Sequence, residues 1–228
     1  MNRFAFLMIY LLLITTTGFS QTDISIKIGA TPWHINHDFD DLTKPYSLSY
    51  TTGLNIEQAI PNSGIAFQTG IEYTYSQPGT NYIDRTDNEN LLAVLYQQSI
   101  NERYINRTHH EFVVPLMFVL YANDMRIGLG GSYRRYQFGD FDFSGILNAE
   151  EDYGLNASVG ARFSKRVAFS IGYYYGLKPF VNLTVLPDSG VEGPQLNGTM
   201  QQISVSLSFS LFNKLTHNRY YLSPLPVQ

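Results

Sequence analysis

Residues 201–212 alternate strictly between large apolar and small polar side chains. In a β-strand, successive side chains point to opposite faces, so this segment would have one apolar face and one hydroxyl face. The apolar face holds Ile203, Val205, Leu207, Phe209 and Leu211. The opposite face holds Ser204, Ser206, Ser208 and Ser210. The pattern predicts a strand that separates an apolar environment from a polar one.

The same period of two recurs along most of the chain. The eight runs cover about residues 24–30, 48–56, 65–75, 112–120, 125–133, 153–163, 167–175 and 201–212. Their apolar faces carry no Asp, Glu, Lys or Arg, as expected on a lipid-facing surface, where Arg or Lys costs roughly 2–4 kcal/mol at the bilayer midplane. Their opposite faces are rich in Gly and Ser, which suit the crowded lumen of a small barrel. We therefore predict an all-β protein, an eight-stranded antiparallel up-and-down transmembrane β-barrel; the alternative is a soluble lipocalin-like carrier.

The connections between the runs alternate in length. Short turns are expected near residues 59–62, 122–124 and 164–166, and long loops at about 34–46, 77–110, 137–151 and 177–200. Outer-membrane barrels have short periplasmic turns and longer extracellular loops. An even number of strands then leaves both termini of the chain in the periplasm. Pro115 lies in the fourth run, and because proline cannot donate to a ladder we expect a β-bulge there.

The N-terminus has the features of an export signal. Residues 1–20 combine Arg3, an apolar run over 4–14 and small residues before an expected cleavage site after Ser20. The predicted domains are thus a signal peptide over 1–20, a barrel over 21–212 and an extended periplasmic tail over 213–228. The absence of cysteine excludes disulfides, and the formal net charge of −4 argues against nucleic acid as a partner. Export and a transmembrane barrel together predict the outer membrane of a Gram-negative bacterium.

Polar side chains at inward-facing positions form the first candidate site. By strand parity they are Lys27, Glu57, Gln68, Glu72, Arg126, Arg134, Asn156 and Arg162, together with Asn55. Buried charges need partners, so we expect an ion-pair and hydrogen-bond network that fills the lumen. The alternative is a narrow, gated ion channel, although a barrel of this size leaves no open pore.

Histidines near the long loops are candidates for chemistry. His34, His37 and Asp38 fall in the first long loop, and His109 and His110 begin the fourth strand. Imidazole and carboxylate suit Zn²⁺, but the spacing matches no zinc motif, so we predict no metal site and no cofactor. An outer-leaflet enzyme that modifies lipid A could use a histidine with an acid. His110 and Glu111 are adjacent and point to opposite faces of a strand, which disfavours a direct catalytic pair between them. We therefore predict that the chain is not an enzyme.

The second long loop contains a candidate binding segment. Acidic and Asn side chains over 87–90 precede an apolar run, which is typical of a helix start. A short helix would place Leu91, Leu92, Leu95 and Ile100 toward one side. Such a helix could cap the barrel mouth or bind a protein partner, because apolar surface outside the membrane often marks an interface.

Two short segments carry a family resemblance. One is the glycine-rich run Gly64-Ile65-Ala66-Phe67-Gln68-Thr69-Gly70-Ile71-Glu72-Tyr73, and the other is Phe112-Val113-Val114-Pro115-Leu116. They resemble the small outer-membrane barrels of Bacteroidota, the PorT-like or OmpA-like barrel domains. The second is similar to that family's Leu-Glu-Ile-Pro-Leu strand, with Val113 in place of the acidic residue. The resemblance implies the barrel fold and an outer-membrane location, in contact with lipid and lipopolysaccharide.

From these features we predict a structural or partner-binding barrel with a side-chain-filled lumen. Its partner would bind through the extracellular loops, and the barrel could be an accessory of an outer-membrane or secretion complex. A lipid A-modifying enzyme, an ion channel and a soluble carrier are the alternatives.

Overall fold

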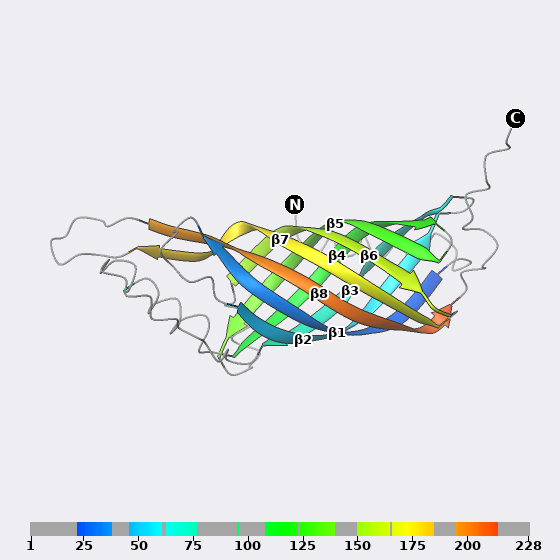
Figure 1. Cartoon of the computed structure of the whole chain (residues 1–228), viewed down its shortest axis with the longest axis horizontal. Coiled ribbons are helices and arrows are strands. Elements are labelled where there is room, and N and C mark those ends of the chain that lie inside the picture. Colours follow the sequence, from blue (N-terminus) through cyan, green and yellow to red (C-terminus); the bar gives the residue numbers. More distant parts are fainter. Residues whose placement is uncertain are drawn as a thin grey trace, which may run out of the picture.

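The computed structural model describes residues 22–37, 46–60, 63–76, 95, 108–122, 124–139, 150–164, 166–184 and 195–213. Eight strands make up nearly all of them (Figure 1). Their bounds are β1 Thr22–His37, β2 Tyr46–Ala59, β3 Ile65–Ser76, β4 His109–Ala122, β5 Met125–Phe138, β6 Glu150–Arg162, β7 Val167–Thr184 and β8 Gln195–Asn213. No helix within these ranges is long and apolar enough to cross a membrane.

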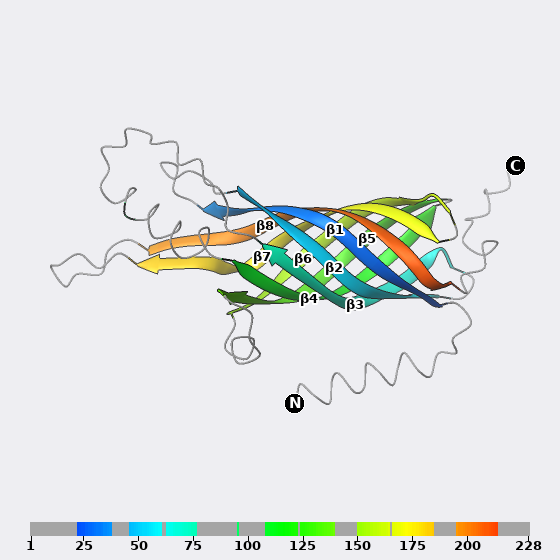
Figure 2. The ribbon, with the colours of Figure 1, turned by 90° about the horizontal axis from the view of Figure 1, so that it is seen from below.

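The sheet closes into a barrel. Each strand pairs antiparallel with the next in sequence, and β1 also pairs with β8. Figure 2 shows the strands wound around a common axis. The links after β2, β4 and β6 are short and lie at one end, which we call the short-turn end; the opposite end is the long-loop end. The predicted eight-stranded up-and-down barrel is confirmed.

The outer wall of the barrel is apolar. Side chains such as Ile71, Phe118 and Leu211 are 66%, 60% and 63% exposed. None of the side chains assigned to the lipid face is buried. The charged side chains that the structure describes lie in the lumen or at the two ends of the barrel. An apolar exterior around a polar interior is the arrangement of a barrel in lipid, and it contradicts the soluble lipocalin-like alternative.

Three strands extend further toward the long-loop end than predicted. The loop predicted over 177–200 is largely strand, because β7 continues to Thr184 and pairs there with Gln195 of β8. The loop predicted from residue 34 begins later, since β1 continues to His37, which pairs with Gly198. In Figure 1 the ends of β7 and β8 project beyond the other strands. At the other end, β8 includes Asn213, which we had assigned to the tail.

The bulge predicted at Pro115 is not found between the described strands β3, β4 and β5. β4 pairs residue by residue with β5, and Pro115 lies opposite Ser132. Pairing with β3 omits two residues, Gly70 and Ile71, and then resumes in the same register. The missing N–H donor of Pro115 is therefore accommodated by a gap in one ladder, without an extra residue.

Candidate functional site

Ion pairs occupy the lumen from one end of the barrel to the other. Among the described residues they are Arg162–Asp23 at 3.0 Å, Arg126–Glu57 at 3.1 Å, Lys27–Glu72 at 2.8 Å and Arg134–Glu111. All of these side chains belong to inward-facing positions, because their neighbours in sequence face lipid. Two of the carboxylates, Asp23 and Glu111, were not selected from the sequence. The charges of the lumen are thus paired across strands that are distant in sequence.

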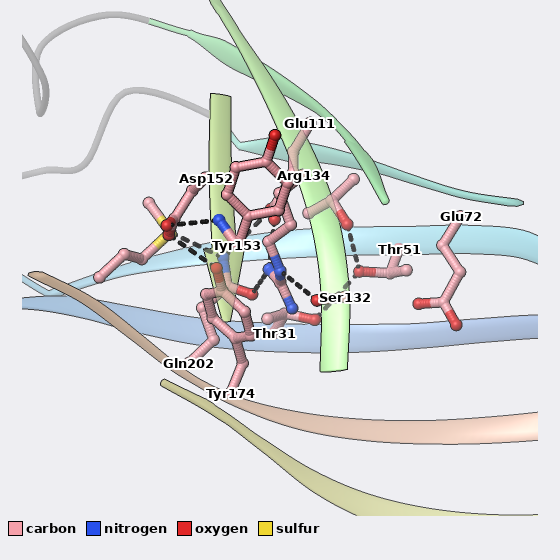
Figure 3. A network of polar contacts seen from close by, with 12 residues as sticks. Thr31, Thr51, Glu72, Glu111, Ser132, Arg134, Asp152, Tyr153, Tyr174 and Gln202 are labelled. Carbon is pink, nitrogen blue, oxygen red and sulfur yellow. Dashed lines mark hydrogen bonds and ion pairs between the residues drawn. The ribbon is translucent and has the colours of Figure 1, made fainter. Parts of the chain in front are cut away.

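Arg134 is the centre of a buried network toward the long-loop end (Figure 3). Its guanidinium donates to the Glu111 carboxylate and to the Gln202 side-chain oxygen. Gln202 Nε2 in turn donates to Glu111 at 3.1 Å, so the three side chains bind one another across the lumen. The Arg134 Nε donates to Ser132 at 3.3 Å, and the Tyr174 ring centre lies 3.4 Å from the guanidinium carbon. Arg134 is therefore held by a carboxylate, an amide, a hydroxyl and an aromatic face.

Asp152 connects this network to the backbone of β6 and β7. Its carboxylate accepts from the Tyr174 hydroxyl at 2.6 Å and from the backbone N–H groups of Tyr153 and Lys178 at 2.7 and 3.0 Å. Gly154 makes room for this arrangement, because a Cβ there would lie 2.1 Å from the Tyr174 ring. The glycine lets the ring approach the β6 backbone while it stacks on Arg134.

Large side chains close the lumen between this network and the long-loop end. Trp33, His109, Tyr136 and Met200 are all almost completely buried. The Trp33 indole N–H donates to Ser76 Oγ at 3.2 Å, and its ring meets His109 edge to face with centroids 5.1 Å apart. Among the residues that the structure describes, the ring nitrogens of His109 have no hydrogen-bond partner. Ring packing therefore dominates at this end of the lumen.

The short-turn half of the lumen is closed by ion pairs and small side chains. Glu57 accepts from Arg126 at 3.1 Å and from the Tyr121 hydroxyl, and Arg126 also donates to Gln68 at 2.7 Å. Asp23 accepts from Arg162 at 3.0 Å. It also accepts from Ser210 at 2.7 and 2.9 Å. A small apolar cluster completes the packing with Ala59, Ala66, Val119 and Tyr121.

Among the described residues, two polar cavities lie between these groups. The larger has a volume of about 70 Å³; it is lined by the Lys27–Glu72 pair, Asn55, Arg126 and Asn156, and it also reaches Arg134, Tyr174 and Gln202 of the long-loop network. The smaller, about 10 Å³, lies beside Asp23 and Arg162, and Arg126 lines both. Asn55 Oδ1 and Arg126 Nε are buried and have no hydrogen-bond partner in the described part of the chain. A polar cavity of the larger size holds on the order of five waters, which could satisfy both atoms.

The candidate metal ligands do not converge within the described residues. His109 lies in the lumen, whereas His110 faces outward, where its Nδ1 is 2.7 Å from the Tyr73 hydroxyl oxygen. His34 lies on β1 opposite Tyr46. The side chain of His37 and all of Asp38 are outside the described residues. In the part of the chain that the structure describes, no group of three or more His, Asp or Glu could hold a metal ion.

The candidate binding helix is described at one position only. Leu95 is helical and 39% exposed. Leu91, Leu92 and Ile100 lie outside the described residues. A cap on the barrel mouth or a binding helix in this segment therefore stays a prediction.

Several lumen residues were missed in the sequence. They are Asp23, Glu111, Asp152, Tyr174 and Gln202. Each is adjacent in sequence to an apolar residue already assigned to the lipid face. Strand parity could therefore have placed all of them in the lumen.

Comparison with known families identifies the barrel. The family model described as outer membrane protein beta-barrel domain matches residues 3–182. The chain belongs to this family, and the protein is an outer-membrane β-barrel. No curated protein matches the sequence.

Solved structures similar to the barrel have low sequence identity to it. Neisserial surface protein A is 11% identical with a TM-score of 0.43, over 82% of this chain and 97% of that one. Ail, the attachment invasion locus protein of Yersinia pestis, is 10% identical with a TM-score of 0.44, over 84% and 99% of the two chains. The outer membrane enzyme PagL is 13% identical with a TM-score of 0.40, over 82% and 97%. The prediction that the chain is not an enzyme is wrong, because the similar barrels include an enzyme and so the lack of a His110–Glu111 pair does not exclude catalysis.

Proposed function

We propose that this outer-membrane barrel has a closed lumen and binds a partner through its long-loop end. The binding platform is the part of β1, β7 and β8 that projects at that end. The observation that carries the proposal is the continued pairing of these three strands, which would hold a rigid sheet outside the bilayer.

The lengths of the strands support this reading. A tilted strand needs about 9–11 residues to span a bilayer, whereas β1, β7 and β8 have 16, 18 and 19. β7 and β8 pair as far as Thr184 and Gln195, although pairing between β6 and β7 extends only to Gly154 and Gly176. The additional length has no spanning role, so we assign it to recognition.

The filled lumen favours a binding platform over a wide channel. The buried rings of Trp33, His109 and Tyr136 and the Arg134 network fill the lumen toward the same end of the barrel. A packed interior of this kind resists deformation. An accessory role beside an outer-membrane or secretion complex is the form of partner binding that we favour.

Site-specific cross-linking in cells tests this proposal. A photoreactive amino acid replaces Leu177, which is exposed on β7, or Arg166 as the control at the short-turn end. We expect a discrete protein adduct from position 177. A shortened variant, with an Asn-Gly turn in place of 180–198, should lose this adduct but keep the faster gel migration of an unboiled barrel. An adduct that survives shortening, or one found at position 166 alone, contradicts the proposal.

A narrow ion path is the second candidate function, favoured by the two polar cavities that share Arg126. In this case the Arg126–Glu57 pair would act as the barrier between them. Planar-bilayer recording should then show a higher, steady conductance for Arg126→Ala than for the unchanged protein. The exposed Glu150→Gln substitution is the control. Equal conductance in all three proteins excludes the path.

A further inference from the structure

Tyrosines on the outer wall are confined to one end of the membrane band. The outward tyrosines that the structure describes are Tyr50, Tyr73, Tyr75, Tyr133, Tyr153, Tyr173 and Tyr175. Five of them lie in the long-loop half of their strands, and Tyr173 and Tyr175 lie in the long-loop half of the part of β7 that pairs with β6. Outward positions at the short-turn end hold residues such as Phe163 and Leu211. Tyrosine combines an apolar ring with a hydroxyl and collects where lipid chains meet headgroups. These rings therefore mark the headgroup level at the long-loop end.

Two cations lie beside this level, on the two strands that flank β6. Arg135 of β5 is one position beyond Arg134 and faces outward, opposite Glu151 of β6. The Lys178 ammonium on β7 lies 4.6 Å from the centre of the Tyr153 ring. Tyr153 itself pairs with Tyr133, directly below the Arg135–Glu151 pair. Two tyrosine rings, a guanidinium and an ammonium thus form one patch across β5, β6 and β7, which we call the basic–tyrosine patch.

The fold turns Lys178 toward the outside. The pairing of β7 with β8 is irregular between Tyr175 and Pro179. Lys178 and its two neighbours are all exposed, so the usual alternation of faces is interrupted. The buried Asp152 carboxylate fixes this irregularity, since it accepts from the Lys178 backbone N–H at 3.0 Å. The ammonium is therefore preorganised at the patch.

The charge of the patch favours an anion. Arg135 and Lys178 contribute two positive charges and Glu151 one negative charge. Glu151 also accepts a hydrogen bond from the Tyr133 hydroxyl, which disperses its charge. Glu150 pairs with the inward-facing Tyr136 and therefore points to the other face of β6. A net positive charge remains at headgroup height.

We infer that the basic–tyrosine patch binds a phosphate group of an outer-leaflet glycolipid. Guanidinium and ammonium groups are the side chains that bind phosphate, the first by paired hydrogen bonds and the second as a point charge. The tyrosine rings below contact the first carbons of the acyl chains. Lys178 lies at the base of the projecting part of β7, so this lipid site adjoins the projecting sheet, but it does not depend on a protein partner.

Lipid retention by the full mature barrel tests the site. The protein is refolded in neutral phospholipid vesicles that contain lipid A with both phosphates or lipid A with none. Arg135→Gln and Lys178→Gln are compared with Arg166→Gln, an exposed arginine at the short-turn end. The amount of lipid A that co-purifies is measured, and gel migration of the unboiled sample verifies that each variant is folded.

We expect each removed cation to reduce the amount of retained phosphorylated lipid A about fivefold. This factor corresponds to the usual contribution of one basic residue to binding at an anionic membrane surface. The Arg166 variant should retain the unchanged amount, and lipid A without phosphates should not distinguish the proteins. Equal retention by all folded variants overturns the inference. A loss that is the same for both forms of lipid A overturns it as well, because the phosphate would then not be recognised.

Discussion

The two ends of the lumen are filled by different kinds of side chain. Toward the long-loop end, the rings of Trp33, His109 and Tyr136 pack over the network around Arg134. Toward the short-turn end, the Arg162–Asp23 pair lies beside a polar cavity and small apolar side chains. The difference indicates that the layer of rings at the long-loop end is dry and rigid, whereas the short-turn end can take up water. The larger polar cavity reaches Arg134 from the side away from these rings. A charge should therefore depend more strongly on its protein partner at the long-loop end.

Removing the charge of Glu111 is expected to have the largest effect. Glu111 is completely buried and is the carboxylate that neutralises Arg134. Glu111→Gln leaves the guanidinium charge without its carboxylate. Because the larger cavity reaches Arg134 on one side, we expect the free energy of unfolding to fall by about 3–4 kcal/mol, in the lower part of the range for breaking a buried ion pair. Denaturant unfolding in detergent, followed by the fluorescence of Trp33, measures this change. The exposed Glu150→Gln serves as the control, and an equally small effect of both would show that water in the larger cavity offsets the loss of the carboxylate.

Strand parity explains how much of this arrangement was predictable. The alternation over 201–212 predicts both the strand and its two faces. In a closed barrel, side chains with a period of two must alternate between the outer wall and the lumen. The partner of each charge was not predictable. Arg134 binds Gln202 on the far side of the lumen, and Lys27 reaches Glu72 across the intervening β2. Such pairs depend on strand tilt and register, which local patterns do not encode.

The projecting ends of β7 and β8 were missed for a related reason. Residues such as Pro179, Asn182 and Gly198 are poor strand formers, so the segment resembles a loop in isolation. Pairing between the two strands, and of β8 with β1, overrides this local preference. At Pro115 the sequence correctly indicated a missing donor, but the ladder adapts without a bulge.

Adding a methyl group at Gly154 tests how tightly the long-loop half is packed. A Cβ at this position would lie 2.1 Å from the Tyr174 ring and 2.5 Å from the Tyr175 carbonyl oxygen. Gly154→Ala should therefore displace the ring from Arg134 and lower the free energy of unfolding by about 3 kcal/mol. Gly131→Ala is the matched control, since its Cβ would come no closer than 3.1 Å to any atom. If the two alanine variants unfold at the same denaturant concentration, the packing around Tyr174 is loose.

The corresponding charge at the short-turn end should matter less. Asp23→Asn weakens the hydrogen bonds to Arg162 and Ser210, but the adjacent cavity lets water replace part of them. We expect a loss of about 1.5–2 kcal/mol, at the low end for hydrogen bonds to charged groups. Unfolding measured as for Glu111→Gln gives the direct comparison. A loss as large as that of Glu111→Gln would remove the proposed difference in hydration between the two ends.

The smallest change in the free energy of unfolding is expected on removing the Trp33 hydrogen bond. This substitution tests whether water reaches the indole ring and does not change a charge. Ser76→Ala removes the acceptor of the buried indole N–H, which should lower the free energy of unfolding by about 1 kcal/mol. Because water cannot reach the vacated position, the emission of Trp33 should shift to shorter wavelength. Ser170→Ala, which removes one hydroxyl of a half-buried pair beside the larger cavity, should leave the emission unchanged. A shift to longer wavelength in Ser76→Ala would mean that water enters at Trp33, so that both ends of the lumen are hydrated.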